Sequence, residues 1–235
     1  MSMTRVPDPS LFPPSVVQHT VRFRVDRHPP LPVNSEFESI VLPDFLARTV
    51  RKRQIEFLAG RYCAREALRC CVPEHADTPI GVGPNREPLW PSGIVGAITH
   101  TADFASVAVA RISDARALGL DCERIMDEAT AREVQDSLAR PAELQALLRV
   151  TGWSVRELLT MVFSAKESLF KALYPQVCRY FDFLDVSLEE VDSVRGIFRG
   201  RLWTTLAPDL PVGHPVEGRF ERRAGEICTA VMLPP

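Results

Sequence analysis

Two stretches of this 235-residue chain decide how it is interpreted, and the first reads Gly119-Leu120-Asp121-Cys122-Glu123. The second lies further along the chain and reads Phe163-Ser164-Ala165-Lys166-Glu167-Ser168-Leu169-Phe170-Lys171. The first stretch ends a predicted strand, in which alternate side chains share a face, so Asp121 and Glu123 project together. The second predicts a helix that supplies a third carboxylate, Glu167. Three hard oxygen donors are typical of a magnesium site, and Lys166 and Lys171 beside them suit a phosphate that shares the metal.

Each stretch also has an ordinary structural interpretation. Surface strands often carry two carboxylates, and Lys166, Glu167 and Lys171 are compatible with a solvated helix face that holds one Glu-to-Lys pair. However, apolar residues surround these charges on the helix and predict that it is largely buried. A charged group on a buried helix needs a partner. Two adjacent carboxylates also repel each other unless a cation or a proton relieves them.

Composition limits the classes of function. The 28 basic and 30 acidic residues leave a formal net charge of −2, without the general positive field expected of a nucleic-acid-binding protein. The six cysteines show no C-x-x-C spacing, and we expect reduced thiols that lie mostly in the core. We find neither a secretory signal nor an apolar run long enough to cross a membrane, so we expect a cytoplasmic protein.

The first half of the chain predicts one long helix and two strands, preceded by a proline-rich segment. Residues 1–35 predict an irregular arm or an edge strand segment around 16–25. Apolar spacing predicts a single helix over 44–72, which carries Arg53, Arg61 and Arg65 on one side. Arginines can be scattered on a surface by chance, but together with Arg86 these would also suit a phosphomonoester. Strands are predicted at 94–99 and 105–110, after a loop at 84–91, with His100 at the bend between them.

The second half predicts a mixture of helices and strands. A third strand is expected at 117–123 and helices within 127–150, where Pro141 suits a first helical turn. Ser154 and Glu157 form a capping box that opens a helix over 155–174, which Pro175 should end. Short strands follow at 186–188, 196–202 and 226–232. The fold class is therefore α+β, with two comparable halves divided near Ser113.

Five motifs, taken in order, resemble those of the 4′-phosphopantetheinyl transferases of the surfactin and enterobactin synthetase type. They are Arg53-x-x-Glu56-Phe57-x-x-Gly60-Arg61, Arg86-Glu87-Pro88-Leu89-Trp90-Pro91, Gly96-Ala97-Ile98-Thr99-His100, and the two stretches quoted above. Together they cover about Arg51 to Pro175. The resemblance is specific because the motifs occur in one chain and in the family's order.

The resemblance implies a fold of two similar α/β halves related by a pseudo-twofold axis. The N-terminal half would comprise residues 1–113 and the C-terminal half residues 114–235, with coenzyme A in the cleft and the metal site at the interface. The metal ligands would be Asp121, Glu123 and Glu167. The residues around the coenzyme A phosphates would be Arg53, Arg61, Arg86, Thr99, His100 and Lys171.

The reaction that the resemblance implies is transfer of the 4′-phosphopantetheine arm from coenzyme A to a serine of an apo acyl or peptidyl carrier protein. Mg²⁺ would be required, 3′,5′-ADP would be released, and Glu167, Lys171 and His100 would be catalytic. We expect a monomer with no nucleic-acid or membrane partner. The carriers could serve fatty acid, polyketide, nonribosomal peptide or siderophore assembly. Two alternatives are a module that binds coenzyme A or a carrier without catalysis, and a magnesium-dependent phosphodiesterase.

Overall fold

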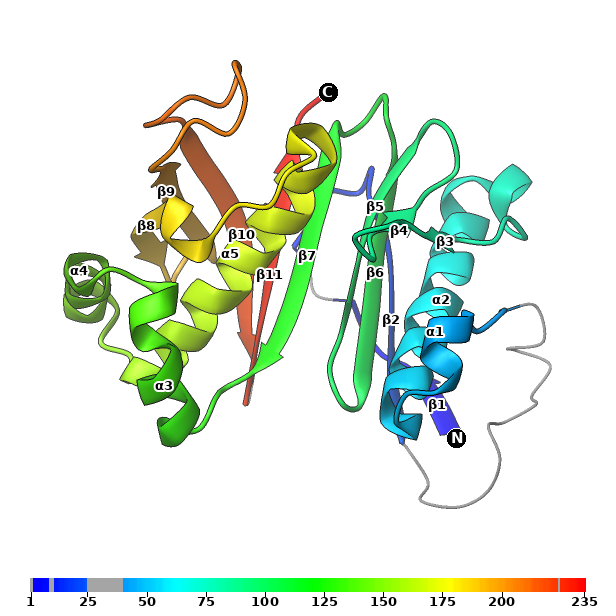
Figure 1. Ribbon diagram of the computed structural model, residues 1–235, viewed down its shortest axis with the longest axis horizontal. Helices are drawn as coiled ribbons and strands as arrows, with labels where there is room; N and C mark the ends of the chain where they lie inside the picture. The colour runs from blue at the N-terminus through cyan, green and yellow to red at the C-terminus, as the bar shows by residue number, and fades with distance from the viewer. Residues whose placement is uncertain (1, 9–10, 25–39, 224) are drawn as a thin grey trace. The chain divides into compact units, whose positions relative to one another are not determined.

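The computed structural model describes all residues except 1, 9–10, 25–39 and 224 (Figure 1). The chain forms two compact units, which comprise mainly Pro13–Leu118 and Gly119–Leu233 and are called unit 1 and unit 2 below. Within the described residues, no helix is both long enough and apolar enough to span a membrane.

Unit 1 is a four-stranded antiparallel sheet covered by one long helix, α2 (Arg51–Cys71). The strand order is β1-β2-β6-β5, with bounds β1 (Ser2–Arg5), β2 (Val17–Arg24), β5 (Ile94–His100) and β6 (Phe104–Arg111). Helix α2 buries Ile55, Ala59, Cys63 and Ala67 at a spacing of four residues, which places them on the face that contacts β2 and β6. Small side chains on this face allow the helix to approach the sheet closely.

The single helix predicted over 44–72 is wrong, because the structure has two helices. Helix α1 (Asp44–Ala47) ends where the Thr49 backbone N–H and hydroxyl both donate to Leu46 O, at 3.0 and 2.8 Å. Val50 then takes an extended conformation before α2 begins at Arg51. The Gln54 side chain satisfies backbone carbonyls left open by the break.

Short elements complete unit 1. They are the 3-10 helix η1 (Pro73–His75) and the hairpin of β3 (Gly81–Val82) and β4 (Pro88–Leu89). The strands predicted at 94–99 and 105–110 and the edge strand at 16–25 are confirmed as β5, β6 and β2. The irregular arm predicted within 1–35 is wrong at Ser2–Arg5, which pair with β2 as β1, and its residues 25–35 lie outside the described residues.

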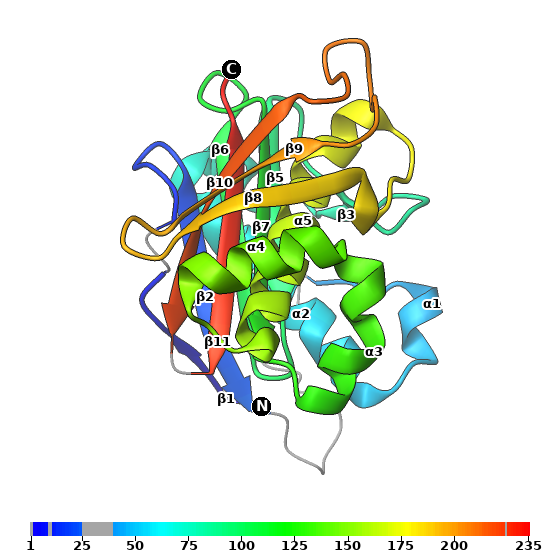
Figure 2. The same cartoon turned by 90° about the vertical axis from the view of Figure 1, so that its left-hand side faces the viewer.

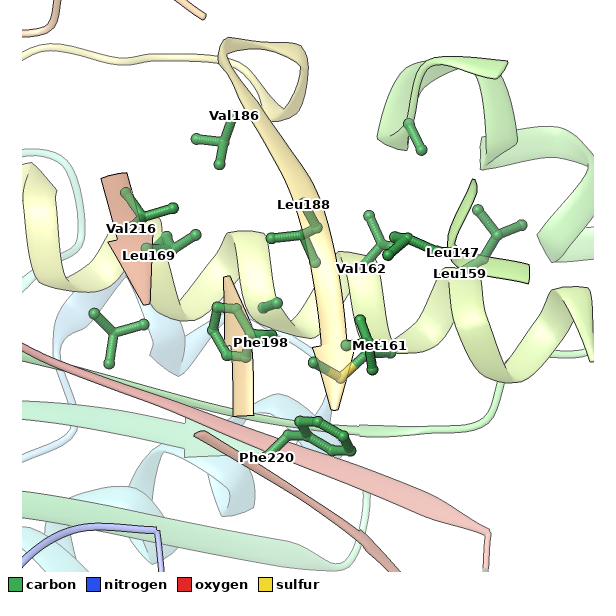
Figure 3. Packing of buried hydrophobic residues seen from close by; sticks show 14 of the residues in the cluster. Leu147, Leu159, Met161, Val162, Leu169, Val186, Leu188, Phe198, Val216 and Phe220 are labelled. Atoms are coloured by element: carbon green, nitrogen blue, oxygen red, sulfur yellow. The ribbon is translucent and has the colours of Figure 1, made fainter. Parts of the chain in front are cut away.

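Unit 2 is a five-stranded sheet with the order β7-β11-β10-β9-β8, so β7 is an edge strand. The bounds are β7 (Ala117–Arg124), β8 (Val186–Asp192), β9 (Ile197–Leu202), β10 (Pro215–Arg223) and β11 (Glu226–Leu233). Helix α5 (Val155–Val177) packs against β11 over a core that includes Leu169, Phe198 and Phe220 (Figure 3). Helices α3 (Glu128–Leu138) and α4 (Pro141–Thr151) both contact α5, and α4 also contacts β8 (Figure 2). The 3-10 helix η2 (Phe183–Asp185) precedes β8.

Most predicted elements of unit 2 are confirmed, including Pro141 in the first turn of α4 and the capping box of α5. The predicted end of α5 at Tyr174 is wrong, because the helix continues through Pro175 to Val177. It ends where Cys178 adopts a left-handed conformation and its N–H bonds Tyr174 O at 2.8 Å. A proline this near the C-terminus removes one backbone donor and does not disrupt a full following turn.

The expectation that all cysteines are reduced is wrong for one pair. The structure joins Cys122 on β7 to Cys228 on β11 in a disulfide. The two residues are separated by 106 positions in the sequence and become neighbours only because β7 pairs with β11. Cys63, Cys70, Cys71 and Cys178 are free thiols.

Candidate active site

The three predicted metal carboxylates lie in unit 2, on β7 and on the helix that packs beside it. Asp121 and Glu123 alternate with Cys122 on β7, and Glu167 projects from the middle of α5. The strand and the helix come close at Gly119, where a Cβ atom would overlap the carbonyl oxygen of Ser168. Only glycine allows this approach, so it fixes Asp121 close to the helix.

Lys171 connects the same two elements. Its Nζ donates to the Leu120 carbonyl at 3.1 Å and to Asp121 Oδ1 at 2.7 Å. Glu167 and Lys171 are one turn apart on α5, and the structure gives Lys171 a partner on β7 as well. The side chain of Asp121 is 4% exposed and the side chain of Lys171 is 27% exposed, so the pair lies at the border between core and solvent.

The three carboxylates influence each other electrostatically. Burial, helped by the charges of Asp121 and Glu167, raises the pKa of Glu123 to about 7, while Lys171 acts in the opposite direction. Burial and Asp121 also raise the pKa of Glu167, again against Lys171. Negative charge is therefore concentrated where a cation would relieve it. The side chains do not form a finished coordination set, since no group of three or more His, Cys, Asp or Glu among the described residues is arranged to hold a metal ion.

Lys166 does not accompany Glu167, contrary to the sequence-based expectation. It is 2% exposed and donates to the Leu138 carbonyl at 2.7 Å and to Glu143 Oε2 at 3.3 Å. Glu143 in turn accepts from the backbone N–H of Leu188 at 2.9 Å. Lys166 and Glu143 thus connect α5, the α3–α4 junction and β8, which is a structural role. Only the need for a partner on a buried helix was visible in the sequence.

In unit 1 the structure brings together two of the predicted phosphate ligands. Arg53 Nη1 lies 2.9 Å from His100 Nε2, where the first turn of α2 meets the end of β5. Glu56 lies between them, 3.4 Å from Arg53 Nη1 and 3.8 Å from His100 Nδ1. Glu56 was part of a sequence motif without an assigned role, and its position here holds the arginine and the imidazole side by side.

The other predicted phosphate ligands of unit 1 have different surroundings. Arg61 donates to Gly81 O at 3.1 Å, and its guanidinium lies 4.7 Å from the centre of the Phe57 ring. Burial lowers the pKa of Arg61 to about 10. Arg86 lies in the β3–β4 turn with a φ of 69°, and Thr99 is 3% exposed on β5. The structure thus unites Arg53 with His100 but gives Arg61 a separate partner.

Comparison with known proteins matches both units. Residues 42–110 match the 4′-phosphopantetheinyl transferase N-terminal domain, and residues 117–213 match the 4′-phosphopantetheinyl transferase superfamily. The 4′-phosphopantetheinyl transferase Svp of Streptomyces mobaraensis is 35% identical over 209 residues, which cover 83% of this chain and 79% of the relative. The 4′-phosphopantetheinyl transferase PptT of Mycobacterium tuberculosis is 34% identical over 196 residues, with 80% and 82% covered. Enterobactin synthase component D of Escherichia coli is 38% identical over 143 residues, with 58% and 64% covered.

The chain belongs to the 4′-phosphopantetheinyl transferase superfamily.

All predicted site residues of this phosphopantetheinyl transferase fall within the two matched segments. The basic group of unit 1 lies in residues 42–110, and the carboxylates and Lys171 lie in residues 117–213. Glu143 is the structurally important residue that sequence reasoning missed. Its sequence signal was only a glutamate in the first turn of a helix, which ordinary helix capping explains equally well.

Proposed function

We propose that this phosphopantetheinyl transferase moves the 4′-phosphopantetheine arm of coenzyme A to a serine of an apo acyl or peptidyl carrier protein and releases 3′,5′-ADP. The observation that supports this most directly is the meeting of Asp121, Glu123, Glu167 and Lys171 in unit 2, within the segment that matches the superfamily. Carboxylates and a lysine at one place suit a divalent cation together with phosphate.

The chemistry of the donors suits Mg²⁺, although their present arrangement in the described residues is not a coordination group. Asp121, Glu123 and Glu167 offer oxygen ligands, and burial together with the charge of Asp121 raises the pKa of both glutamates, an effect that a cation would oppose. When bound, the ion would supply charge neutralisation at the pyrophosphate. Lys171, which donates to Asp121 Oδ1, would contribute a further positive charge toward a phosphate.

The chain's own residues account for the proton and charge movements. In the reaction the serine hydroxyl attacks the β-phosphorus, the bond from that phosphorus to the ADP oxygen breaks, and the serine proton must be accepted. We assign this role to Glu167, directly or through a water, because a carboxylate can accept the proton and Glu167 lies one helical turn from Lys171, which donates to Asp121. Lys171 and His100 would stabilise the charge that develops on the departing phosphate.

We assign the basic residues of unit 1 to the nucleotide end of coenzyme A. Arg53, Arg61 and Arg86 would bind the 3′-phosphate, which guanidinium groups suit. His100, which lies beside Arg53, and Thr99 would contact the pyrophosphate. The pantetheine end would remain accessible to the carrier, which we expect to come from nonribosomal peptide, polyketide or siderophore assembly.

A mass assay tests the proposal. Purified protein, Mg²⁺ and coenzyme A are mixed with each of several apo carriers, and the intact mass of the carrier and free phosphopantetheine are both measured. We expect a carrier that gains the arm, with an Asp121→Asn variant as the inactive control. Free phosphopantetheine with an unmodified carrier would instead indicate hydrolysis, and coenzyme A binding without any product would indicate a binding module.

A further inference from the structure

Glu56 on α2 is a buried carboxylate to which the proposed function gives no role. Helix α2 is described along its whole length, and its other buried residues are uncharged. The Glu56 side chain is 10% exposed, compared with 46% for Arg53 and 28% for His100. Burial of a carboxylate costs free energy unless cations or hydrogen-bond donors compensate it. The groups around Glu56 therefore indicate what it does.

The Glu56 carboxylate faces two of the residues assigned to coenzyme A. Its Oε2 lies 3.4 Å from Arg53 Nη1 and 3.8 Å from His100 Nδ1, while Oε1 lies 3.8 Å from Lys52 Nζ. Arg53 Nη1 also lies 2.9 Å from His100 Nε2. A guanidinium has donors only, so Nε2 accepts from Arg53 and the hydrogen of the imidazole is on Nδ1. The imidazole thus has Arg53 at one nitrogen and Glu56 near the other.

Gly60 allows the helix to lie close to the strand that carries His100. Glu56 and Gly60 are one turn apart on α2. A Cβ atom at Gly60 would lie 3.1 Å from Ile98 Cγ2 on β5, two residues before His100. Any larger residue would crowd Ile98, so glycine keeps the carboxylate within reach of the end of β5.

Helix stability alone does not explain Glu56. Lys52 and Arg53 precede it by four and three residues, and this order is less favourable than a glutamate that precedes its cation. The same cations lie in the first turn of α2, where the helix dipole disfavours positive charge. A carboxylate beside residues assigned to phosphates also opposes an anionic ligand. Conflicts of this kind are typical of functional sites.

We propose that Glu56 is a positioning residue for coenzyme A binding, which holds the Arg53 guanidinium in the orientation that receives the 3′-phosphate. Long side chains lose rotamer freedom when a ligand orders them, and a guanidinium that is already held loses less. His100 supports the same guanidinium from the end of β5. The inference rests on the proposed function, since coenzyme A supplies the phosphate that Arg53 binds.

Calorimetry with coenzyme A and with dephospho-coenzyme A tests the proposal, because the second ligand lacks the 3′-phosphate. We expect Glu56→Gln to raise the Kd for coenzyme A roughly tenfold and to change the Kd for dephospho-coenzyme A much less. In the transfer assay, KM for coenzyme A should rise while kcat stays close to that of the unaltered protein, since a positioning role in binding affects affinity and leaves the chemical step unchanged.

Two further variants separate positioning from a general effect on the helix. Glu66→Gln is the matched control, because Glu66 pairs with Arg65 and Arg69 of the same helix at 3.5 and 2.8 Å. It should leave both Kd values and KM unchanged. Glu56→Asp keeps the charge with a shorter reach and should weaken coenzyme A binding less than Glu56→Gln.

A double-variant cycle shows whether Glu56 acts through Arg53. Adding E56Q to R53Q should cause no further loss of coenzyme A affinity, because the guanidinium that Glu56 holds is then missing. Unchanged or tighter coenzyme A binding in E56Q would overturn the inference. So would equal losses for the two ligands, or losses that add in R53Q/E56Q. An unaltered protein that binds coenzyme A but transfers no arm would instead refute the proposed function and leave the role of Glu56 intact.

Discussion

The two units use the same scaffold, a sheet covered by one long helix, to hold opposite charges in different surroundings. In unit 2 the charged groups lie at mid-helix and mid-strand, and the Asp121 side chain is only 4% exposed. In unit 1 they lie at element ends, and the side chains of Arg53 and His100 are 46% and 28% exposed. Buried charges interact strongly and are costly to leave unpaired, whereas exposed charges are screened by water. We therefore expect unit 2 to determine the rate of the reaction and unit 1 to adjust ligand affinity.

Removal of a carboxylate from unit 2 should have the largest effect. In Asp121→Asn the size of the side chain is kept while one metal ligand loses its charge, and Lys171 loses its anionic partner. We expect kcat/KM to fall on the order of a thousandfold, which corresponds to about 4 kcal/mol of transition-state stabilisation. Steady-state kinetics with a Mg²⁺ titration measures this loss.

The control for this prediction is a measurement that the variant remains folded. The far-UV circular dichroism spectrum and thermal midpoint of Asp121→Asn should remain close to those of the unaltered protein. A folded variant that retains full activity and the same Mg²⁺ dependence would show that Asp121 takes no part in the reaction. The expectation that unit 2 determines the rate would then be wrong.

Lys166 tests how much a buried ion pair outside the catalytic group contributes to the stability of unit 2. Lys166→Met leaves the Glu143 carboxylate inside unit 2 without its cationic partner, and both side chains are 1% exposed. Breaking a buried ion pair from one side costs about 3–5 kcal/mol of the free energy of unfolding. Chemical denaturation should show this loss, and the double variant K166M/E143Q should recover part of it, because the amide carries no buried charge and its oxygen can still accept from the Leu188 N–H. An exposed, weak pair would instead give similar stability in all three proteins.

Local signals in the sequence were sufficient for most elements of both units. The capping box at Ser154 and the short apolar runs of β5 to β7 identified their helix and strands. Strand β10 was missed, although its residues alternate regularly between exposed and buried positions, because Gly218 interrupts the apolar pattern. The break before α2 depends on the hydrogen bonds of Thr49 and Gln54, which apolar periodicity does not reveal.

The site was predictable to a different degree in the two units. Alternation on a strand was enough to place Asp121 and Glu123 together, and helix spacing placed Glu167 and Lys171 one turn apart. The partners of Lys166 and Lys171 could not be predicted, since Glu143 and Asp121 are 23 and 50 residues away from them in the chain. The same holds for Arg53 and His100, which are 47 residues apart and meet only when α2 packs across the sheet.

Changes at Arg53 should have a smaller effect than changes in unit 2. Arg53→Gln removes the guanidinium beside His100 but keeps a polar side chain in a partly exposed position. We expect KM for coenzyme A to rise roughly tenfold to a hundredfold with little change in kcat, since a charge-assisted contact contributes about 1.5–3 kcal/mol to binding. A fall in kcat with an unchanged KM would instead place Arg53 in the chemical step. Unit 1 would then also affect the rate, contrary to the expectation that it adjusts only ligand affinity. Arg132→Gln on the surface of unit 2 is the matched control.

The smallest expected effect is on the pH dependence of stability and comes from a buried histidine of unit 1. Unlike this histidine, the buried Lys166 of unit 2 has hydrogen-bond partners. His19 on β2 is 6% exposed, and the described residues offer its Nε2 no hydrogen-bond partner. Burial, and less strongly Arg5, lowers the pKa of His19 below its ordinary value of 6.5, against the opposing charges of Asp8 and Glu66. Between that lowered pKa and 6.5 the unfolded chain binds more protons than the folded one, so the free energy of unfolding falls as pH drops through this window. The slope is at most about 1.4 kcal/mol per pH unit for one proton. Hydrogen exchange of the β2 amides between pH 7.5 and 5 should show this loss of stability in the unaltered protein and a smaller loss in His19→Gln. The amides of β11 in unit 2 serve as the control and should respond alike in both proteins. Equal loss at β2 in the two proteins would show that another group is responsible.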